Sequence, residues 1–219
     1  MKILQAAQAV LAELPDHITV VAAAKRRTPE EIEEVIQAGI VHIGQNYVQE
    51  AQALRSAVNV EATWRMIGHL QRNKVRRAME SCDWIDSIDS VRVAQMVDDV
   101  AAETGRVMPV LVEINSGREP NKTGFLPEEV GERVREIAEF EHLRIHGIMT
   151  MGPRFGNPED SRPYFIETRK AFERLAAMRV GNVEMKILSM GMSNSYPIAI
   201  EEGANMIRLG TILFGSRPA

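Results

Sequence analysis

The 219-residue chain has few of the features that mark secreted, membrane-spanning or nucleic-acid-binding proteins. Its only cysteine is Cys82, which excludes an intramolecular disulfide. No apolar run approaches the roughly 20 residues of a membrane span, and residues 1–14 lack the continuous apolar stretch of a signal peptide. The formal net charge is -4, so no basic excess favours nucleic acid or an anionic membrane. We therefore expect a cytoplasmic protein that binds neither.

The sequence also lacks a recognisable cluster of metal-ligating residues. The sequence has five histidines, and two of them, His42 and His146, fall inside predicted strands. No spacing of histidine, cysteine and carboxylate residues resembles a metal site. We expect no bound metal.

The chain instead contains a regular alternation of short apolar runs and amphipathic segments. The predicted strands cover residues 18–24, 40–43, 63–67, 84–88, 108–114, 143–148, 184–188 and 206–209. The predicted helices cover residues 2–14, 29–38, 47–58, 73–81, 91–105, 127–140, 158–178 and 197–202. Strict alternation predicts a parallel sheet, and eight repeats favour a single closed (β/α)8 TIM barrel over residues 1–219. An open doubly wound sheet is the alternative.

One helix start carries three signals at once. Thr28 is a capping residue, Pro29 stands at the first helical position, and Glu31 follows three residues after the cap. Gly39 is suited to end the same helix.

The first predicted strand ends on Lys25, which would place a primary amine at the mouth of such a barrel. A lysine amine must be neutral to form a Schiff base. Apolar surroundings, together with Arg26 and Arg27, are predicted to lower the pKa of this amine. The alternative is that Lys25 simply opens a solvated basic turn with the two arginines.

The loops after the last two strands are predicted to bind phosphate. Residues 189–193 read Ser-Met-Gly-Met-Ser, and Gly210-Thr211 follows the final strand. Both loops expose backbone N–H groups and hydroxyls without bulky side chains, at the place where barrels often hold a phosphate. The alternative is that they are ordinary tight turns.

Arg208 is predicted to point into the barrel, because Ile207 and Leu209 on the opposite strand face suit the helices. A buried guanidinium needs a partner. That partner is either an inward carboxylate, such as Glu113 or Asp86, or part of a ligand. An amine, a phosphate site and an arginine at one mouth fit a phosphorylated aldehyde. Pyridoxal 5′-phosphate (PLP) is the first candidate, and a sugar-phosphate aldolase without PLP is the competing one.

Several motifs, in the same order along the chain, resemble the pyridoxal phosphate homeostasis protein family, which is related to the alanine racemase barrel. The matching blocks cover residues 21–25, 44–50, 67–74, 87–89, 121–124, 188–193, 208–211 and 214–215. The resemblance implies a PLP fold type III-like barrel without the C-terminal β-domain of alanine racemase. The chain departs from the family pattern at Ala24, where serine or threonine is usual, and at Gln45, where glutamate is usual.

The same resemblance implies roles for individual residues. Lys25 would carry the Schiff base, Asn46 would line the cofactor ring, and Arg208 would face the pyridine nitrogen. An arginine there keeps that nitrogen unprotonated, which weakens carbanion chemistry. The phosphate-binding set would comprise residues of the last two loops, namely Met190, Gly191, Ser193, Gly210 and Thr211.

The function that the resemblance implies is binding rather than catalysis. The protein would hold PLP as a lysine Schiff base, serve vitamin B6 homeostasis, and contain no catalytic residue. PLP-dependent apoenzymes are the candidate recipients, and we expect a monomer. The alternative is a PLP-dependent amino-acid racemase of low activity. In the related racemase a tyrosine of the C-terminal β-domain is the second base, and this chain ends just past the eighth strand.

Other residues near the predicted mouth have weaker signals. Tyr47, in the turn after the second strand, either approaches the cofactor ring or makes a local hydrogen bond, and we favour the local contact. His69 stands where it could touch a ligand. Four methionines are expected to give adaptable packing near the ring: Met149, Met151, Met190 and Met192. The basic residues Arg72, Lys74, Arg76 and Arg77 are expected to form a solvated helix face.

Overall fold

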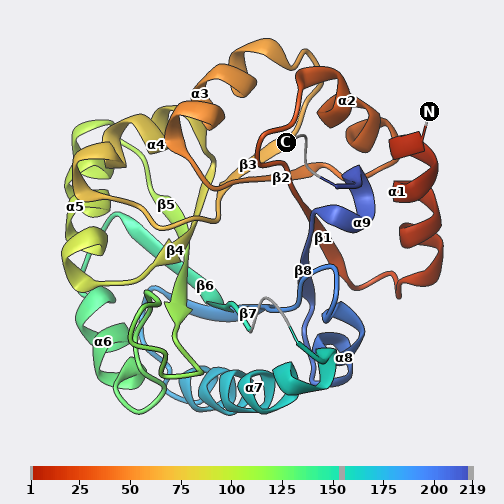
Figure 1. Cartoon of the computed structure of the whole chain (residues 1–219). Coiled ribbons are helices and arrows are strands. Elements are labelled where there is room, and N and C mark those ends of the chain that lie inside the picture. The colour runs from red at the N-terminus through yellow and green to blue at the C-terminus, as the bar shows by residue number, and fades with distance from the viewer. Residues whose placement is uncertain (1, 153–155, 217–219) are drawn as a thin grey trace.

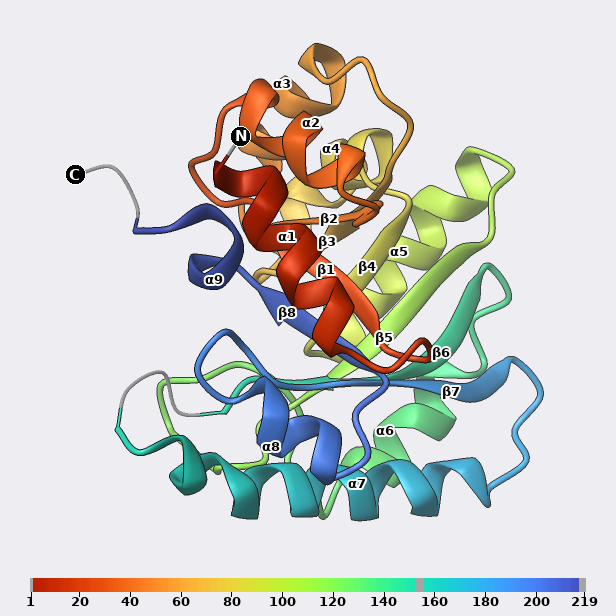
Figure 2. The same cartoon turned by 90° about the vertical axis from the view of Figure 1, so that its right-hand side faces the viewer.

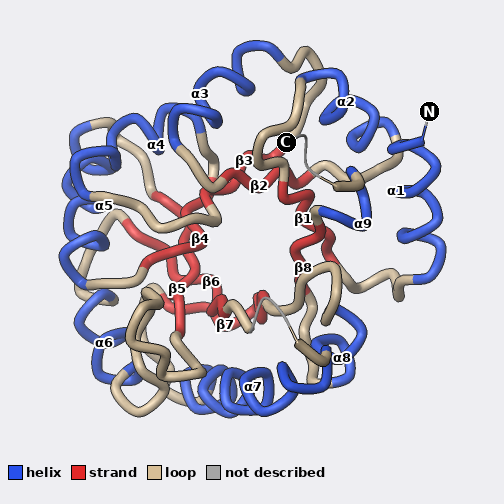
Figure 3. Tube along the Cα trace, viewed as in Figure 1, coloured by secondary structure: helices blue, strands red, loops and turns tan. Residues whose placement is uncertain are grey.

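The computed structural model describes residues 2–152 and 156–216 and contains a closed barrel of eight strands. Each strand pairs in parallel with its neighbours in the sequence, and β1 (Thr19–Ala23) pairs with β8 (Met206–Leu209) to close the ring. The strands form the inner ring and the helices surround it (Figure 1, Figure 3). The predicted (β/α)8 barrel is confirmed, and the open sheet is excluded.

The bounds of the elements follow the predicted alternation. The other strands are β2 (His42–Gln45), β3 (Thr63–Met66), β4 (Trp84–Ile88), β5 (Met108–Ile114), β6 (Leu143–Thr150) and β7 (Val183–Ser189). The helices are α1 (Lys2–Glu13), α2 (Pro29–Gln37), α3 (Val48–Ala57), α4 (Val75–Ser81), α5 (Val91–Glu103), α6 (Val130–Ile137), α7 (Arg162–Ala176), α8 (Tyr196–Glu201) and α9 (Thr211–Phe214). Two 3-10 turns precede α4 and α7, namely η1 (Arg72–Lys74) and η2 (Pro158–Ser161).

The predicted cap of α2 is confirmed. The Thr28 hydroxyl accepts a hydrogen bond from the Glu31 N–H at 3.3 Å, and the Glu31 carboxylate accepts one from the Thr28 N–H at 2.9 Å. At the other end, the Ile40 N–H donates back to the Val35 carbonyl at 3.2 Å, beside Gly39 at φ +108°. Because Ile40 is used in closing the helix, β2 begins at His42 and not at residue 40 as predicted.

The predicted helices at 127–140 and 158–178 are longer than the observed ones. Helix α6 begins at Val130, and the second region is divided between η2 and α7. The short helix α9 was not predicted. Seen from the side, α9 lies at the end of the barrel where the strands finish (Figure 2). Within the described ranges, every helix is too short or too polar to span a bilayer.

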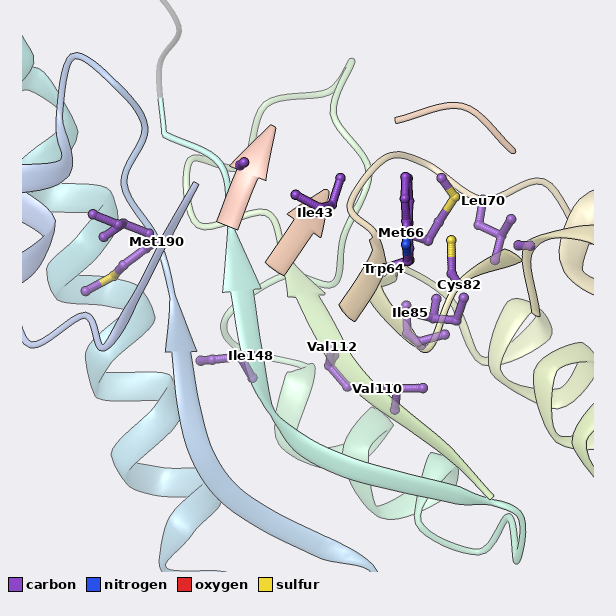
Figure 4. Packing of buried hydrophobic residues seen from close by; sticks show 14 of the residues in the cluster. Ile43, Trp64, Met66, Leu70, Cys82, Ile85, Val110, Val112, Ile148 and Met190 are labelled. Carbon is purple, nitrogen blue, oxygen red and sulfur yellow. The ribbon is translucent and has the colours of Figure 1, made fainter. Parts of the chain in front are cut away.

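The hydrophobic core has two layers. The larger layer lies between the strands and the helices and includes Ile43, Trp64 and Met190 (Figure 4). A smaller cluster of buried side chains comprises Val21, Ile67, Leu111, Met149 and Met206. The strand alternation therefore sends one set of apolar side chains outward to the helices and another set inward.

Charged side chains are also buried with the inner set. Arg65 and Asp86, on adjacent strands, form an ion pair with two hydrogen bonds of 2.7 and 2.9 Å. Their side chains are 1% and 0% exposed. The Arg65 guanidinium also lies 4.1 Å from the centroid of the Trp84 ring.

Candidate functional site

A cavity of about 850 Å³ opens where β1 and β8 end. That volume lies within the range of roughly 300–1,000 Å³ typical of small-molecule sites. The cavity is lined by Ala23, Lys25, Arg27, Gly156, Met192, Ser193, Asn194, Arg208, Gly210, Thr211, Ile212 and Ser216. Five of the predicted site residues are therefore brought together: Lys25, Ser193, Arg208, Gly210 and Thr211.

Lys25 is half-buried and extends from the end of β1 into this cavity. Its Nζ donates a hydrogen bond to the hydroxyl of Tyr47 at 3.0 Å. The neighbouring Arg27 is buried, and its guanidinium donates to Glu31 at 3.1 Å and to the Gly215 carbonyl at 2.7 Å. Arg27 is therefore not part of the solvated basic turn that was the alternative, whereas Arg26 is exposed.

The two departures from the family pattern lie beside Lys25 but outside the cavity lining. The Ala24 side chain is fully buried in the outer apolar layer. Gln45 is also fully buried, and its Nε2 donates to the Ala24 carbonyl at 3.4 Å. An ionised glutamate could not donate to that carbonyl. Glutamine therefore suits the local backbone at this position.

The last two loops are tied together by one hydroxyl. Ser193 Oγ accepts hydrogen bonds from the N–H groups of Gly210 at 3.1 Å and Ile212 at 3.4 Å. The proton of the Ser193 hydroxyl is then left to donate. The Thr211 hydroxyl lines the same cavity, and within the described part of the chain it has no hydrogen-bond partner. Two hydroxyls that are able to donate therefore line the same cavity, which suits an anion.

Two glycines shape this corner in different ways. Gly191 has φ +94°, and a Cβ there would lie 2.6 Å from the Cβ of Ala199. The loop can pack against α8 only because this side chain is missing. A Cβ on Gly210 would lie 3.5 Å from the Ala23 carbonyl oxygen, an ordinary contact distance, but it would occupy cavity space beside Ala23.

Arg208 points inward, as predicted, and is only 4% exposed. Its guanidinium donates to Ser189 Oγ at 2.7 Å and to the Thr150 carbonyl at 2.6 Å. Burial lowers the pKa of Arg208 to about 10. Among the described residues, no carboxylate lies within ion-pair distance of this guanidinium, so the ion pair with Asp86 or Glu113, one of the two partners that the sequence left open, is excluded. Asp86 instead pairs with Arg65.

A second group of titratable residues lies at the ends of β3, β4 and β5. Burial raises the pKa of Glu113 to about 7, and the nearby charge of Asp89 acts in the same direction. The Thr123 hydroxyl donates to Glu113 at 3.3 Å. His69 Nδ1 lies 2.6 Å from Asp89 Oδ2, and about half of the His69 side chain is exposed. None of these residues lines the cavity, so the structure gives His69 no contact with a ligand there.

Three other predicted site residues do not line the cavity. The Met190 side chain is completely buried in the outer apolar layer (Figure 4), so it does not reach the cavity wall. Its neighbour Met192 does line the cavity. Gly191 contributes through its backbone, because its carbonyl accepts the Arg208 N–H at 3.0 Å. Asn46 is half-buried after β2, with its backbone against Gly68.

The basic residues of η1 and α4 behave as expected of a solvated face. Arg72, Arg76 and Arg77 are exposed and Lys74 is half-buried. Arg76 pairs with Glu103 of α5. Among the described residues, no group of three or more histidine, cysteine or carboxylate side chains is arranged to hold a metal ion.

The fold and the lysine-bearing mouth define a barrel of the alanine racemase N-terminal class. The family model described as "Alanine racemase, N-terminal domain" matches residues 4–218. Two relatives carry a more specific name, pyridoxal phosphate homeostasis protein. That of Aquifex aeolicus is 39% identical over 196 residues, covering 89% of this chain and 85% of the relative. That of Synechocystis is 34% identical over 212 residues, covering 95% of each. The chain therefore belongs to the pyridoxal phosphate homeostasis protein family.

Solved structures agree with this assignment. PipY of Synechococcus elongatus, determined without PLP, superimposes with a TM-score of 0.91 at 32% identity and covers 97% of this chain and 100% of its own. PipY with PLP bound gives a TM-score of 0.88 at 31% identity. Alanine racemase of Clostridium difficile gives 0.81 at 18% identity, and the match covers 100% of this chain but 56% of the racemase. At that identity the racemase shares the fold.

Proposed function

We propose that this protein binds PLP in the cavity at the ends of β1 and β8, as a Schiff base on Lys25, and serves intracellular PLP homeostasis. The observation that carries the proposal is that the Lys25 amine and the hydroxyls of Ser193 and Thr211 line one cavity. The names of the relatives and the PLP complex of PipY support the same ligand.

The residues present fit this cofactor. PLP supplies an aldehyde, which reacts reversibly with primary amines, and a phosphate dianion. Lys25 provides the amine, and Ser193, Gly210 and Thr211 provide donors and space for the phosphate. Arg208 is a buried cation in the lining. Placed toward the pyridine nitrogen, it would disfavour protonation of that nitrogen.

The proposal includes three further points about the protein. The whole chain, residues 1–219, is one PLP-binding domain and acts as a monomer in the cytoplasm. Its role is to hold and transfer PLP without catalytic turnover, and PLP-dependent apoenzymes are the recipients. The relatives are named for homeostasis and not for a reaction, which supports this choice over a racemase.

The test is an absorbance spectrum of the purified protein with PLP. We expect an imine band in the wild type and none in Lys25→Ala. Pyridoxine 5′-phosphate, which has no aldehyde, serves as the control ligand and should bind both proteins. An unchanged imine band in Lys25→Ala would contradict the proposal. Lysine-dependent aldol cleavage without PLP would favour the aldolase, and lysine-dependent racemisation of alanine would favour the racemase.

A further inference from the structure

The hydroxyl of Tyr47 is the only hydrogen-bond partner of the Lys25 amine among the described residues. The two atoms lie 3.0 Å apart, and Nζ lies 4.6 Å from the centroid of the Tyr47 ring. The tyrosine is 47% exposed, so its hydroxyl can exchange protons with water. A proton on Nζ therefore has one direct protein acceptor, which itself reaches solvent.

The backbone around this contact holds the two residues together. Tyr47 is the N-cap of α3, and Glu50 in the first turn of the same helix accepts a hydrogen bond from the Arg26 N–H at 3.0 Å. Arg26 has φ +57°, a conformation that is unfavourable for a residue with a side chain. Because Glu50 fixes this turn, the segment that follows Lys25 is tied to the helix that carries Tyr47.

The charge distribution favours an ionisable hydroxyl. The hydrogen bond from Lys25 lowers the pKa of Tyr47, and the positive charge of Lys25 acts in the same direction. Glu50 opposes this effect. The hydrogen bond to Lys25 and the ring beside its amine both come from Tyr47, and not from Tyr164 of α7 or Tyr196 of α8.

We propose that Tyr47 is the proton partner of Lys25, exchanging protons with its amine and with the departing oxygen when the Schiff base forms and when it is released. This rests on the proposed function, since it assigns a further residue to the same reaction of Lys25. It gives Tyr47 a role in the rate of PLP capture and release rather than in affinity.

The protons needed to form the Schiff base can all be supplied by Lys25 and Tyr47. Nζ and Tyr47 Oη share three protons in all, and the count is taken with two on Nζ and one on Oη. The lone pair of Nζ then bonds to the aldehyde carbon while the C=O π pair moves to oxygen. Nζ and Oη each give one proton to that oxygen, which is released as water. Nζ keeps one proton in the new C=N bond, and Oη is left to take up the next proton from Nζ or water.

The experiment compares wild type, Tyr47→Phe and Tyr164→Phe by stopped-flow absorbance between pH 6.5 and 9.5. PLP capture is followed on mixing, and PLP release is followed by trapping with semicarbazide. General acid–base groups contribute about 10²–10⁴-fold, and water can partly replace an exposed hydroxyl. We therefore expect Tyr47→Phe to slow capture and release by at least about tenfold, with a changed pH profile and a Kd within about threefold. Tyr164→Phe should match the wild type.

Two results would overturn the inference. One is capture and release by Tyr47→Phe at wild-type rates with the wild-type pH profile. The other is a matching loss of affinity for pyridoxine 5′-phosphate, since that ligand forms no Schiff base and its loss indicates a structural role. Rescue of the Tyr47→Phe rate by added imidazole would support the proton role. If wild type formed no imine at all, the proposed function would fail first, and the two failures are therefore distinguishable.

Discussion

Arg65 Nε donates to Asp86 Oδ2 at 2.7 Å inside the barrel, and Arg65 Nη2 donates to Asp86 Oδ1 at 2.9 Å. Because Asp86 is engaged by Arg65, Arg208 of β8 has no carboxylate within ion-pair distance in the part of the chain that the structure describes. With Asp86 held by Arg65, the Arg208 guanidinium is left to bond a serine hydroxyl and a backbone carbonyl. Its positive charge therefore remains uncompensated by a direct protein contact and can act on a ligand.

The first prediction concerns the stability of this pair. Removing one partner of a buried ion pair typically costs about 3–5 kcal/mol, because the other charge stays buried alone. We expect Arg65→Met to lower the free energy of unfolding by that amount, measured by urea titration. The double variant Arg65→Met/Asp86→Leu should recover much of the loss. Arg55→Ala, which breaks an exposed pair with Asp83, should cost about 0–1 kcal/mol. A loss below about 1 kcal/mol in Arg65→Met would contradict the burial of the pair.

The second prediction concerns the pH dependence of stability. The pKa of Glu113 is raised from 4.5 to about 7 by burial, so between these values the folded protein holds a proton that the unfolded chain has released. The contribution of this group to stability therefore falls as the pH rises through that window. We expect the stability of wild type relative to Glu113→Gln to drop by up to about 3 kcal/mol between pH 5 and pH 7.5.

Urea titrations of both proteins at several pH values measure this difference. The exposed variant Glu80→Gln is the control for changing a glutamate as such. Parallel stability curves for wild type and Glu113→Gln would show that Glu113 titrates normally.

The third prediction concerns the loop before α8. Gly191→Ala forces a side chain into φ +94° and against Ala199, 2.6 Å away. The left-handed conformation alone costs about 1–2 kcal/mol, and the clash adds to it. We expect a loss of about 2 kcal/mol or more in thermal or urea unfolding, and weaker PLP binding. At Gly181, a Cβ would meet nothing within 4 Å, so Gly181→Ala should change stability by less than about 0.5 kcal/mol. Equal effects of the two substitutions would contradict the packing described for Gly191.

The fourth prediction concerns Ser193. Hydrogen bonds to charged groups contribute about 1.5–3 kcal/mol, which corresponds to roughly 10- to 100-fold in affinity. We expect Ser193→Ala to weaken PLP by that factor in equilibrium titrations. Pyridoxal, which has no phosphate, should bind Ser193→Ala and wild type equally. A parallel loss of pyridoxal affinity would mean that Ser193 shapes the loop and does not bind the phosphate.

Much of the fold could be predicted from the sequence, because its signals are local. The strand and helix periodicities, the capping residues around Thr28 and the inward direction of Arg208 each depend on a few neighbouring residues. The sequence also predicted that Lys25 and the last two loops lie at the same mouth of the barrel, because parallel strands bring their C-terminal ends together there.

What could not be predicted depends on contacts between distant segments. The partner of Arg208 was left open between a carboxylate and a ligand, because nothing local to either strand indicates that Asp86 pairs with Arg65 and not with Arg208. The Lys25–Tyr47 contact joins the ends of two different strands, and sequence reasoning left it open between a cofactor contact and a local hydrogen bond.

The most direct test of the account is to reduce the PLP-loaded protein with borohydride, digest it and map the pyridoxyl group by mass spectrometry. The account predicts one major adduct, on Lys25, which disappears when the same treatment is applied to Lys25→Ala. A major adduct on another lysine, or no stable adduct at all, would contradict it.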